Sequence, residues 1–239
     1  SKPPGGGFLF LSEDEYNSAI QKEPNIAKFI RRVYGSDEYI NNKTRYCLWL
    51  VGASPIDIRK SNFIMERVEG VRNFRLASTK ATRESANTPT LFQEIRVSES
   101  EYIIVPSVSS EKRKYIPLGF MSKDTISTNA NLFIPDATLY HFGILTSNVH
   151  MAWMRAVCGR LEMRYRYSKD IVYNNFPWPN PTPEQKAKIE KTAQAILDAR
   201  ALYPECSLAD LYDELTMPPE LRKAHQDNDA AVMHAYGFS

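Results

Sequence analysis

The sequence predicts an α+β fold, with a mixed domain that has a mainly β core and is followed by a small all-helical domain. Strand and helix patterns follow one another without the regular alternation of a parallel α/β sheet. Residues 160–167 alternate polar and apolar side chains with a period of two, which indicates a strand with one covered face. Because domain boundaries fall in proline-rich stretches such as 177–183, we expect the mixed domain over residues 1–178 and the helical domain over 179–239.

The amino-terminal third predicts a linker, two helices, a strand and a further helix. Residues 1–7 are rich in glycine and proline and predict a linker, as expected of a piece cut from a longer chain. Ser12 precedes three acidic residues and is the expected N-cap of a helix. Residues 24–33 predict a second helix, and 46–51 a buried strand. Residues 70–86 have helical periodicity. The basic face of that helix carries Arg72, Arg75, Lys80 and Arg83.

The middle of the chain is richer in strand patterns. Residues 102–105 and 115–118 predict strands on either side of a polar loop, 107–114, and 125–134 contain another short strand. The loop holds three serines and three cations. Hydroxyls, backbone N–H groups and cations are the usual ligands of phosphate, although a solvated charged loop is the commoner case from sequence alone.

A helix and a strand then follow in succession. Residues 146–158 are apolar and aromatic and predict a helix that Gly159 ends. On the strand after it, the period of two places Glu162, Arg164 and Arg166 on one face. The other face carries Met163, Tyr165 and Tyr167. Arginine donates to the O6 and N7 atoms of guanine and glutamate accepts from the N4 amine of cytosine, so this pattern suits the reading of base edges.

The carboxy-terminal part predicts helices only. Residues 174–179 form a rigid aromatic turn, and 183–203 are an amphipathic helix. Residues 208–215 and 219–235 predict two more helices, the last with a proline in its first turn.

The charge is distributed unevenly. Residues 1–178 hold 24 Lys and Arg against 18 Asp and Glu, whereas 179–239 hold 6 against 10. The basic part is the candidate for a surface that faces phosphates. No run approaches the length of a membrane span, and no signal sequence is evident, which favours a protein without a membrane partner. The three cysteines fit no metal pattern or disulfide framework, so a reducing cytoplasm is expected.

A series of short segments follows in order over nearly the whole chain: 45–50 (RYCLWL), 108–117 (VSSEKRKYIP), 139–145 (LYHFGIL), 159–161 (GRL), 165–168 (YRYS), 176–179 (FPWP) and 215–222 (LTMPPELR). In these segments the chain resembles the target-recognition domain and C-terminal helical region of MmeI-type restriction-modification enzymes, type IIG or IIL. Such enzymes join a nuclease, an adenine-N6 methyltransferase and a DNA-reading domain in one chain.

The resemblance implies that the chain binds double-stranded DNA and that its strand and loop residues read the bases. The implied base readers are Glu162, Arg164, Arg166, Asn129, Ala130 and, more weakly, Ser107. The expected phosphate-binding residues are Ser109, Ser110, Lys112, Arg113, Lys114, Arg72 and Arg75. For Glu162 and Arg164 the alternative is a surface ion pair, and for the basic helix a solvated face.

The motifs of catalysis are missing from these 239 residues. No glycine-rich loop follows a strand, and no Asn-Pro-Pro-Tyr motif or clustered nuclease acids occur. We therefore expect no catalytic residue, metal site or cofactor within the chain. S-adenosylmethionine, and Mg²⁺ for cleavage, are implied for a parent whose methyltransferase and nuclease domains precede this region.

Two other functions remain open at this point. The chain could be a protein-interaction or structural module that uses its helical part for docking. It could also be the specificity domain of a phage-defence adenine methyltransferase that has no nuclease.

Overall fold

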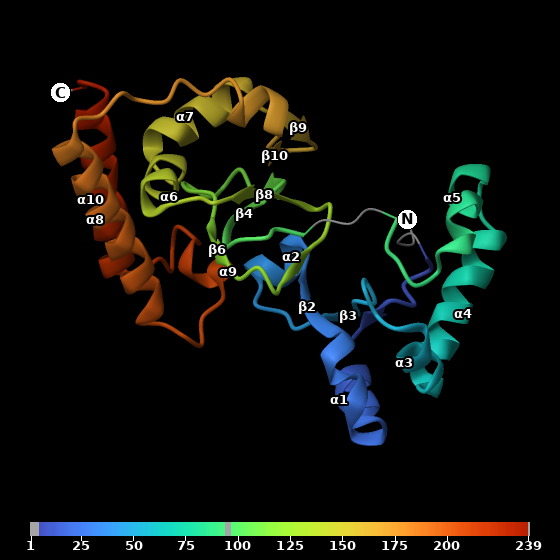
Figure 1. Cartoon of the computed structure of the whole chain (residues 1–239). Helices are drawn as coiled ribbons and strands as arrows, with labels where there is room; N and C mark the ends of the chain where they lie inside the picture. The colour runs from blue at the N-terminus through green and yellow to red at the C-terminus, as the bar shows by residue number, and fades with distance from the viewer. Residues whose placement is uncertain (1–4, 94–96, 239) are drawn as a thin grey trace. The chain divides into compact units, whose positions relative to one another are not determined.

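The computed structural model describes residues 5–93 and 97–238, and the chain divides into two compact units (Figure 1). The first four residues of the predicted linker lie outside the described residues. The first unit comprises the described residues of 1–34, 44–97 and 124–126, and the second those of 35–43, 98–123 and 127–239. Within the described part of the chain, no helix is long and apolar enough to cross a membrane.

The first unit combines an antiparallel sheet with helices. Its sheet has the order β1-β3-β2-β7, formed by β1 (Phe10–Leu11), β3 (Tyr46–Leu48), β2 (Ile30–Tyr34) and β7 (Ile126–Ser127), of which Ile126 belongs to this unit. Its helical segments are α1 (Glu13–Lys22), the 3₁₀ turn η1 (Pro24–Phe29), α3 (Pro55–Arg59), α4 (Asn62–Leu76), α5 (Lys80–Glu84) and η2 (Ser85–Asn87).

The predicted N-cap of α1 is confirmed, whereas the helix predicted over 24–33 is only partly present. The Ser12 hydroxyl accepts from the Glu15 N–H at 3.2 Å, and the Glu15 carboxylate accepts from the Ser12 N–H at 2.9 Å, which is a capping box. The helix expected over 24–33 is wrong in its second half. There β2 pairs with β3, Ile30 opposite Leu48, so a partner distant in sequence overrides the local pattern.

The helix expected over 70–86 is two helices. The first, α4, starts earlier than expected, where the Ser61 hydroxyl accepts from the Ile64 N–H at 3.1 Å. Its inner face packs Ile64, Val68 and Val71 in one core with the strand residue Leu48. Arg75 lies on this inner face and is fully buried, so the basic helical face is not a continuous surface.

The second unit contains two small antiparallel sheets and most of the helices. One sheet has the order β6-β4-β8, formed by Gly119–Met121, Tyr102–Pro106 and Asn131–Pro135. The other has the order β5-β10-β9, formed by Val108–Ser109, Arg164–Arg166 and Gly159–Leu161. The helical segments are α2 (Ser36–Ile40), α6 (Leu139–Leu145), α7 (Asn148–Val157), the π turn η3 (Lys169–Tyr173), α8 (Pro183–Ala201), α9 (Leu208–Leu211) and α10 (Pro219–Ala235).

Of the strands expected in the middle of the chain, that at 102–105 is confirmed as β4 and that at 125–134 as β7 and β8. The strand expected at 115–118 is wrong. Tyr115 and Ile116 are buried but lie in irregular backbone, and β6 begins only at Gly119. The N–H of Ile116 donates to the Met151 sulfur at 3.4 Å instead of to a neighbouring strand.

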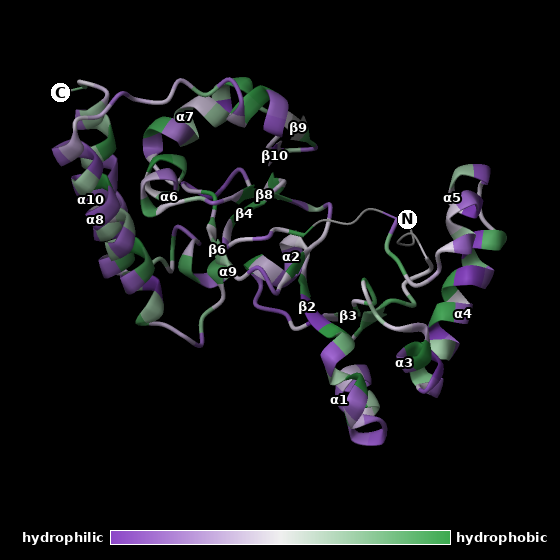
Figure 2. Cartoon of the chain, viewed as in Figure 1, coloured by the Kyte–Doolittle hydropathy of each residue, from purple (hydrophilic) through white to green (hydrophobic). Residues whose placement is uncertain are grey.

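The helices after the proline-rich segment do not pack as a separate body. Ala193 and Ile196 of α8 and Leu221 of α10 share one core cluster with Ile103 and Val105 of β4. The carboxy-terminal helices therefore share their core with the strands of the second unit. The apolar stripes of α8 and α10, visible in Figure 2, need a covering surface, and α6 and β4 supply it.

A glycine sets the distance between α6 and the carboxy-terminal helices. A Cβ atom on Gly143 would stand 2.7 Å from Ile189 Cγ2 and 3.2 Å from Ala193 Cβ, both on α8. The Asn228 amide on α10 donates to the Gly143 carbonyl at 2.8 Å. Three helices thus meet at one residue without a side chain.

Buried polar groups fasten α10 to the rest of this unit. The Asp229 carboxylate accepts from the Tyr115 hydroxyl at 2.6 Å and from the Asn148 N–H at 2.8 Å. Burial raises the pKa of Asp229. His225 and Tyr212 form a second buried pair at 2.8 Å. Each of these contacts satisfies a polar group that water cannot reach.

Candidate nucleic-acid interface

The period-two segment 160–167 forms a β-hairpin rather than the single strand that we predicted. Arg164 pairs with Leu161 and Arg166 with Gly159, so Glu162 and Met163 are the two residues of the turn. Glu162 therefore shares no strand face with Arg164, contrary to the prediction. The backbone reverses at Glu162, which has a left-handed φ of 57°.

Glu162 and Arg164 are nevertheless adjacent. The Arg164 guanidinium donates to the Glu162 carboxylate at 2.8 Å, and the two side chains are 49% and 76% exposed, respectively. An ion pair that is this exposed contributes little to stability. The turn thus holds a donor and an acceptor together at the protein surface, where a ligand can reach both.

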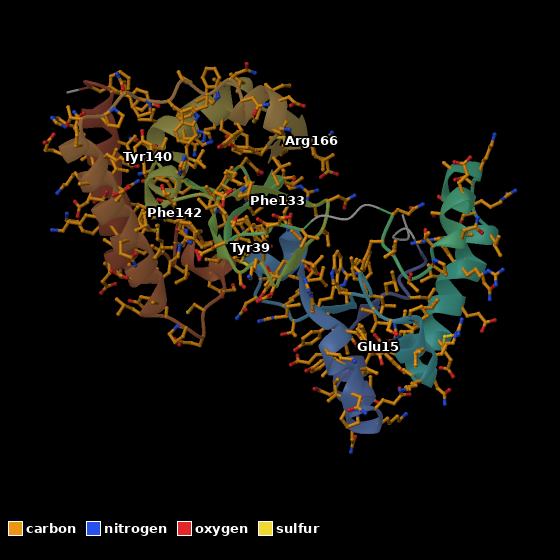
Figure 3. All side chains as sticks on the ribbon, in the orientation of Figure 1. Glu15, Tyr39, Phe133, Tyr140, Phe142 and Arg166 are labelled. Carbon is orange, nitrogen blue, oxygen red and sulfur yellow. The ribbon has the colours of Figure 1, made fainter. Side chains whose placement is uncertain are left out.

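The base of the hairpin is rigid because its tyrosines face inward. Tyr165 and Tyr167 are buried, as the predicted alternation required, whereas Met163 is exposed. The Tyr167 hydroxyl and His150 Nε2 lie 2.9 Å apart. Burial lowers the pKa of His150 to about 3 and raises that of Tyr167, so both groups are neutral at pH 7. Figure 3 shows Arg166 on this hairpin, well apart from the packed ring of Phe142.

Ser107 connects the hairpin to the turn that holds Asn129 and Ala130. The Ser107 N–H donates to the Ala130 carbonyl at 3.1 Å, and the Ser107 carbonyl accepts from the Tyr167 N–H at 2.8 Å. Val108, the next residue, pairs with Arg166. The structure therefore brings together Ser107, the exposed Asn129–Ala130 turn and the hairpin, three segments that are far apart in sequence.

A serine that the sequence did not single out positions this turn. The Ser36 hydroxyl, in the first residue of α2, lies 2.6 Å from the Ala130 carbonyl and 2.9 Å from Asn131 Oδ1. Asn131 itself is fully buried. No local pattern around Ser36 indicates this role, because its partners are more than 90 residues away.

The loop 107–114 divides into buried and exposed residues. Ser109 lies in β5 and is only 2% exposed, and among the described residues its hydroxyl has no hydrogen-bond partner. The expectation that Ser109 binds phosphate with its side chain is therefore wrong. The Ser110 hydroxyl accepts from the Lys112 N–H at 3.2 Å and shapes a turn.

The cations of this loop differ in exposure. Lys112 and Lys114 are exposed, whereas Arg113 is half-buried and its pKa is lowered, chiefly by burial. Arg155 of α7, which sequence reasoning missed, donates to the carbonyl groups of Arg113 and Lys114 at 3.4 and 2.6 Å. Arg155 thus holds the loop backbone, and Lys112 and Lys114 remain available to an anion.

The two arginines expected on the basic helix lie in the first unit and have different environments. Arg72 is exposed, in keeping with either a solvated face or a phosphate contact. Arg75 is 0% exposed and donates to the carbonyl oxygens of Ser85, Thr88 and Leu91 at 2.9, 2.9 and 2.7 Å. Arg75 therefore cannot contact phosphate, because it is fully buried and both of its terminal nitrogens bind the returning backbone.

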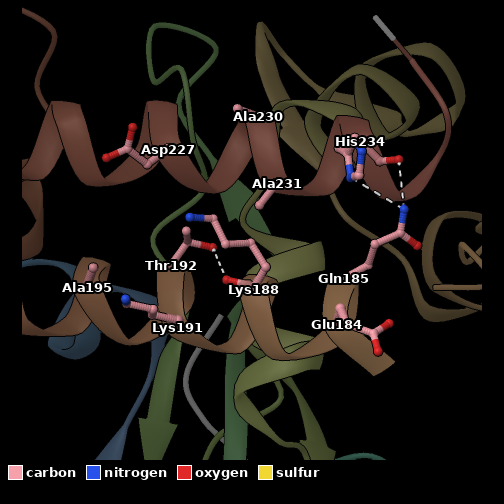
Figure 4. A pocket seen from close by; sticks show the side chains of 10 residues that line it. All are labelled: Glu184, Gln185, Lys188, Lys191, Thr192, Ala195, Asp227, Ala230, Ala231 and His234. Atoms are coloured by element: carbon pink, nitrogen blue, oxygen red, sulfur yellow. Dashed lines mark hydrogen bonds between the residues drawn. The ribbon is translucent and has the colours of Figure 1, made fainter. Parts of the chain in front are cut away.

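The pocket of Figure 4 lies elsewhere, between α8 and α10. Its lining includes Glu184, Lys188, Asp227 and His234, and Thr192 donates to the Lys188 carbonyl at 3.2 Å. Carboxylates and ammonium groups are mixed there, and none of the sequence-predicted site residues lines it. In the part of the chain that the structure describes, no group of three or more His, Cys, Asp or Glu residues is placed to hold a metal ion.

Comparison with known proteins gives matches along the whole chain. Residues 1–180 match the family described as MmeI, target recognition domain, and 181–239 match MmeI, C-terminal domain. DNA methyltransferase A of Bacillus subtilis (strain 168) is 43% identical over 235 residues, which cover 98% of this chain and 27% of that protein. The type IIL restriction-modification enzyme MmeI, solved in complex with DNA, is 48% identical with a TM-score of 0.96. That match covers all of this chain and 32% of the solved one, so the chain spans about a third of its relatives or less.

Proposed function

Because this chain belongs to the MmeI family, whose target recognition and C-terminal domains it matches in order, we propose that it recognises a specific sequence of duplex DNA. The observation that carries the proposal is the hairpin turn, where an exposed carboxylate and guanidinium lie 2.8 Å apart. Beside this hairpin, the backbone of Ser107 joins it to the exposed amide turn of Asn129 and Ala130. A two-stranded ribbon is narrow enough to enter the major groove.

In the proposed complex, the ion pair of Glu162 and Arg164 opens onto one G·C base pair. Glu162 accepts from cytosine N4, and Arg164 donates to guanine O6 and N7. Opening the pair costs little because both side chains are largely solvated in the free chain. Arg166, Asn129 and Ala130 would address neighbouring pairs, with the asparagine suited to adenine and the alanine to a thymine methyl group.

The phosphate contacts in this proposal come from the loop before the buried Tyr115. Lys112 and Lys114 are exposed there, and Arg113 is half-buried. Such contacts fix register and orientation on the duplex without reading sequence. Ser110 contributes by shaping the loop, and Arg72 is a further candidate on the first unit.

We infer the activity of the whole protein from the relatives. One is a DNA methyltransferase and the other a type IIL restriction-modification enzyme. The proposed role of this chain is to place one adenine in a methyltransferase domain of the same protein, which would use S-adenosylmethionine. The adenine must leave the base stack, because its N6 is not accessible to chemistry within the duplex. A nuclease domain, where present, would add Mg²⁺-dependent cleavage. The three free cysteines fit a cytoplasmic location.

Selection of bound sequences from a random duplex pool tests the proposal directly. The 239-residue chain should enrich one short motif that contains a G·C pair, and its affinity should fall steeply with salt. Enrichment of the same motif by the R164A variant, with that pair unchanged, would show that Arg164 is not a reader. Absence of DNA binding at low salt would instead favour a protein-interaction module.

A further inference from the structure

The tip of the hairpin carries an exposed apolar side chain between two charged ones. Met163 is 72% exposed, and Leu161, two residues before it, is 45% exposed. Two-residue hairpin turns are usually formed by Gly, Asn or Asp, because these residues adopt positive φ without strain. Here a glutamate takes the left-handed conformation and a methionine follows it. The left-handed conformation of Glu162 does not favour the stability of the free chain, and the methionine after it is presented to the solvent.

The hairpin below this tip is held in place, so Met163 is presented in a defined position. Tyr165 and Tyr167 are buried at its base, and β5 pairs with β10 alongside. The Arg155 guanidinium lies over the Tyr165 ring at 6.0 Å. A mobile loop tip would lose more conformational freedom on binding than a tip that is anchored in this way.

We propose that Met163 contacts the C5 methyl group of a thymine in the base pair next to the one read by Glu162 and Arg164. This inference rests on the proposed function. The atoms that those two residues address lie on the major-groove edges, and in that groove the thymine methyl is the apolar group that the bases display. Met163 adjoins both readers in sequence. Base pairs lie about 3.4 Å apart, which is close to the roughly 3.8 Å between consecutive Cα atoms, so the Met163 side chain can reach the pair next to the one that its two neighbours share.

The chemistry of methionine suits this contact. Its unbranched thioether is polarizable and adapts to an apolar surface, and it carries no strong hydrogen-bond group to be left unpaired. The alternative is that Met163 inserts between base pairs as a wedge. Apolar wedges are typical of minor-groove binders that kink the duplex, which disagrees with a hairpin whose charged residues suit the major groove.

The test removes the methyl group from the DNA and the thioether from the protein. The selected duplex is remade with uracil in place of each thymine in turn, and dissociation constants are measured for the wild type and for M163S. L215S is the matched control, since Leu215 is 95% exposed on the loop before α10. Circular dichroism and thermal unfolding verify that each variant is folded.

We expect uracil beside the recognised G·C pair to weaken wild-type binding about fourfold, the ratio for one methyl-sized group. M163S should bind the thymine and uracil duplexes equally, and L215S should behave as the wild type. Two binding results would overturn the inference: the absence of a thymine beside that pair in the selected motif, or an equal effect of uracil on the wild type and on M163S. A third result, a Met163-dependent increase in the fluorescence of a neighbouring 2-aminopurine, would overturn it by showing that Met163 inserts between base pairs. Absence of wild-type binding to any duplex would instead overturn the proposed function.

Discussion

The Arg164 guanidinium and the Glu162 carboxylate lie 2.8 Å apart across the two-residue turn of the β9–β10 hairpin. Their adjacency depends on the turn and not on a shared strand face. In the free chain each side chain therefore neutralises the other at the surface, and each becomes available when the pair opens.

Replacing Arg164 by alanine should relax specificity at one base pair. The expected loss is about 1–3 kcal/mol of binding free energy to the preferred site, with little loss on sites altered at that pair. Stability should hardly change, since the ion pair is exposed. The E162K/R164E double variant should favour the opposite orientation of the pair, which mapping of the methylated sites in the whole protein would reveal. An unchanged methylated sequence would leave the two residues as a surface ion pair.

Replacing Lys112 and Lys114 together by alanine should weaken binding to all duplexes alike. Each lost phosphate contact should flatten the slope of log affinity against log salt by about 1. The R222A variant is the control, because Arg222 lies in α10 and pairs with Glu214 at 2.9 Å. Titrations of a preferred and an unrelated duplex at several salt concentrations measure the effect. A loss confined to the preferred duplex would identify the lysines as base readers.

Arg75 should prove essential to the fold of the first unit and irrelevant to DNA. Its truncation leaves three buried carbonyl groups without their donor, so R75A should lower the free energy of unfolding by about 3 kcal/mol or more. R72A, on the exposed face of the same helix, should change it by less than about 0.5 kcal/mol. Urea denaturation of both variants decides the matter, and equal stabilities would contradict this role for Arg75.

Local signals predicted the burial pattern of the segment 160–167 better than its backbone geometry. The alternation over 160–167 correctly placed Tyr165 and Tyr167 inside, because each arm of a hairpin keeps the period of two. The turn went unnoticed since Glu162 and Met163 carry none of the usual turn residues. Pairing of β10 with β5, more than 50 residues earlier, fixes the hairpin and has no local signal.

The burial of individual polar side chains could not be predicted either, because it depends on segments that are distant in sequence. Arg72 and Arg75 lie three residues apart on one helix, a spacing that is also common for pairs of solvated arginines. Only the segment from Ser85 to Leu91, which returns over the helix, buries Arg75. Ser109 likewise belongs to a polar loop by composition, yet its pairing with Tyr165 turns the hydroxyl inward. The C-terminal helices were predicted as helices, but their partners were not.

His150 should make the protein sensitive to acid. Its folded pKa of about 3 lies below the ordinary value of 6.5, because burial disfavours the charged form. The unfolded chain therefore binds a proton first, and stability is lost as the pH falls from 6.5 towards 3. The advantage of the wild type over H150Q in unfolding free energy should shrink by at most about 1.4 kcal/mol per pH unit over that window. Denaturation series of the wild type and H150Q at several pH values measure this difference.

Gly143 should tolerate no side chain. An alanine Cβ would stand 2.7 Å from Ile189 and 3.1 Å from the Asn228 amide oxygen, so α6 and α8 would have to separate. We expect G143A to lower the free energy of unfolding by about 1–3 kcal/mol. G159A is the matched control, since a Cβ at Gly159 meets nothing within 4 Å. Equal thermal midpoints for the two variants would show that the helices can move apart without loss of stability.

The cluster that unites β4 with α8 and α10 determines which chimeras of this protein can fold. A cut in the proline-rich connector would strip the apolar cover from α6 and would separate Ile189, Ala193 and Leu221 from their partners on α6 and β4. Both halves would then expose surfaces that promote aggregation. A graft intended to transfer specificity must therefore either carry the terminal helices with the reading region or exchange only the solvated tips of the hairpin and the turn.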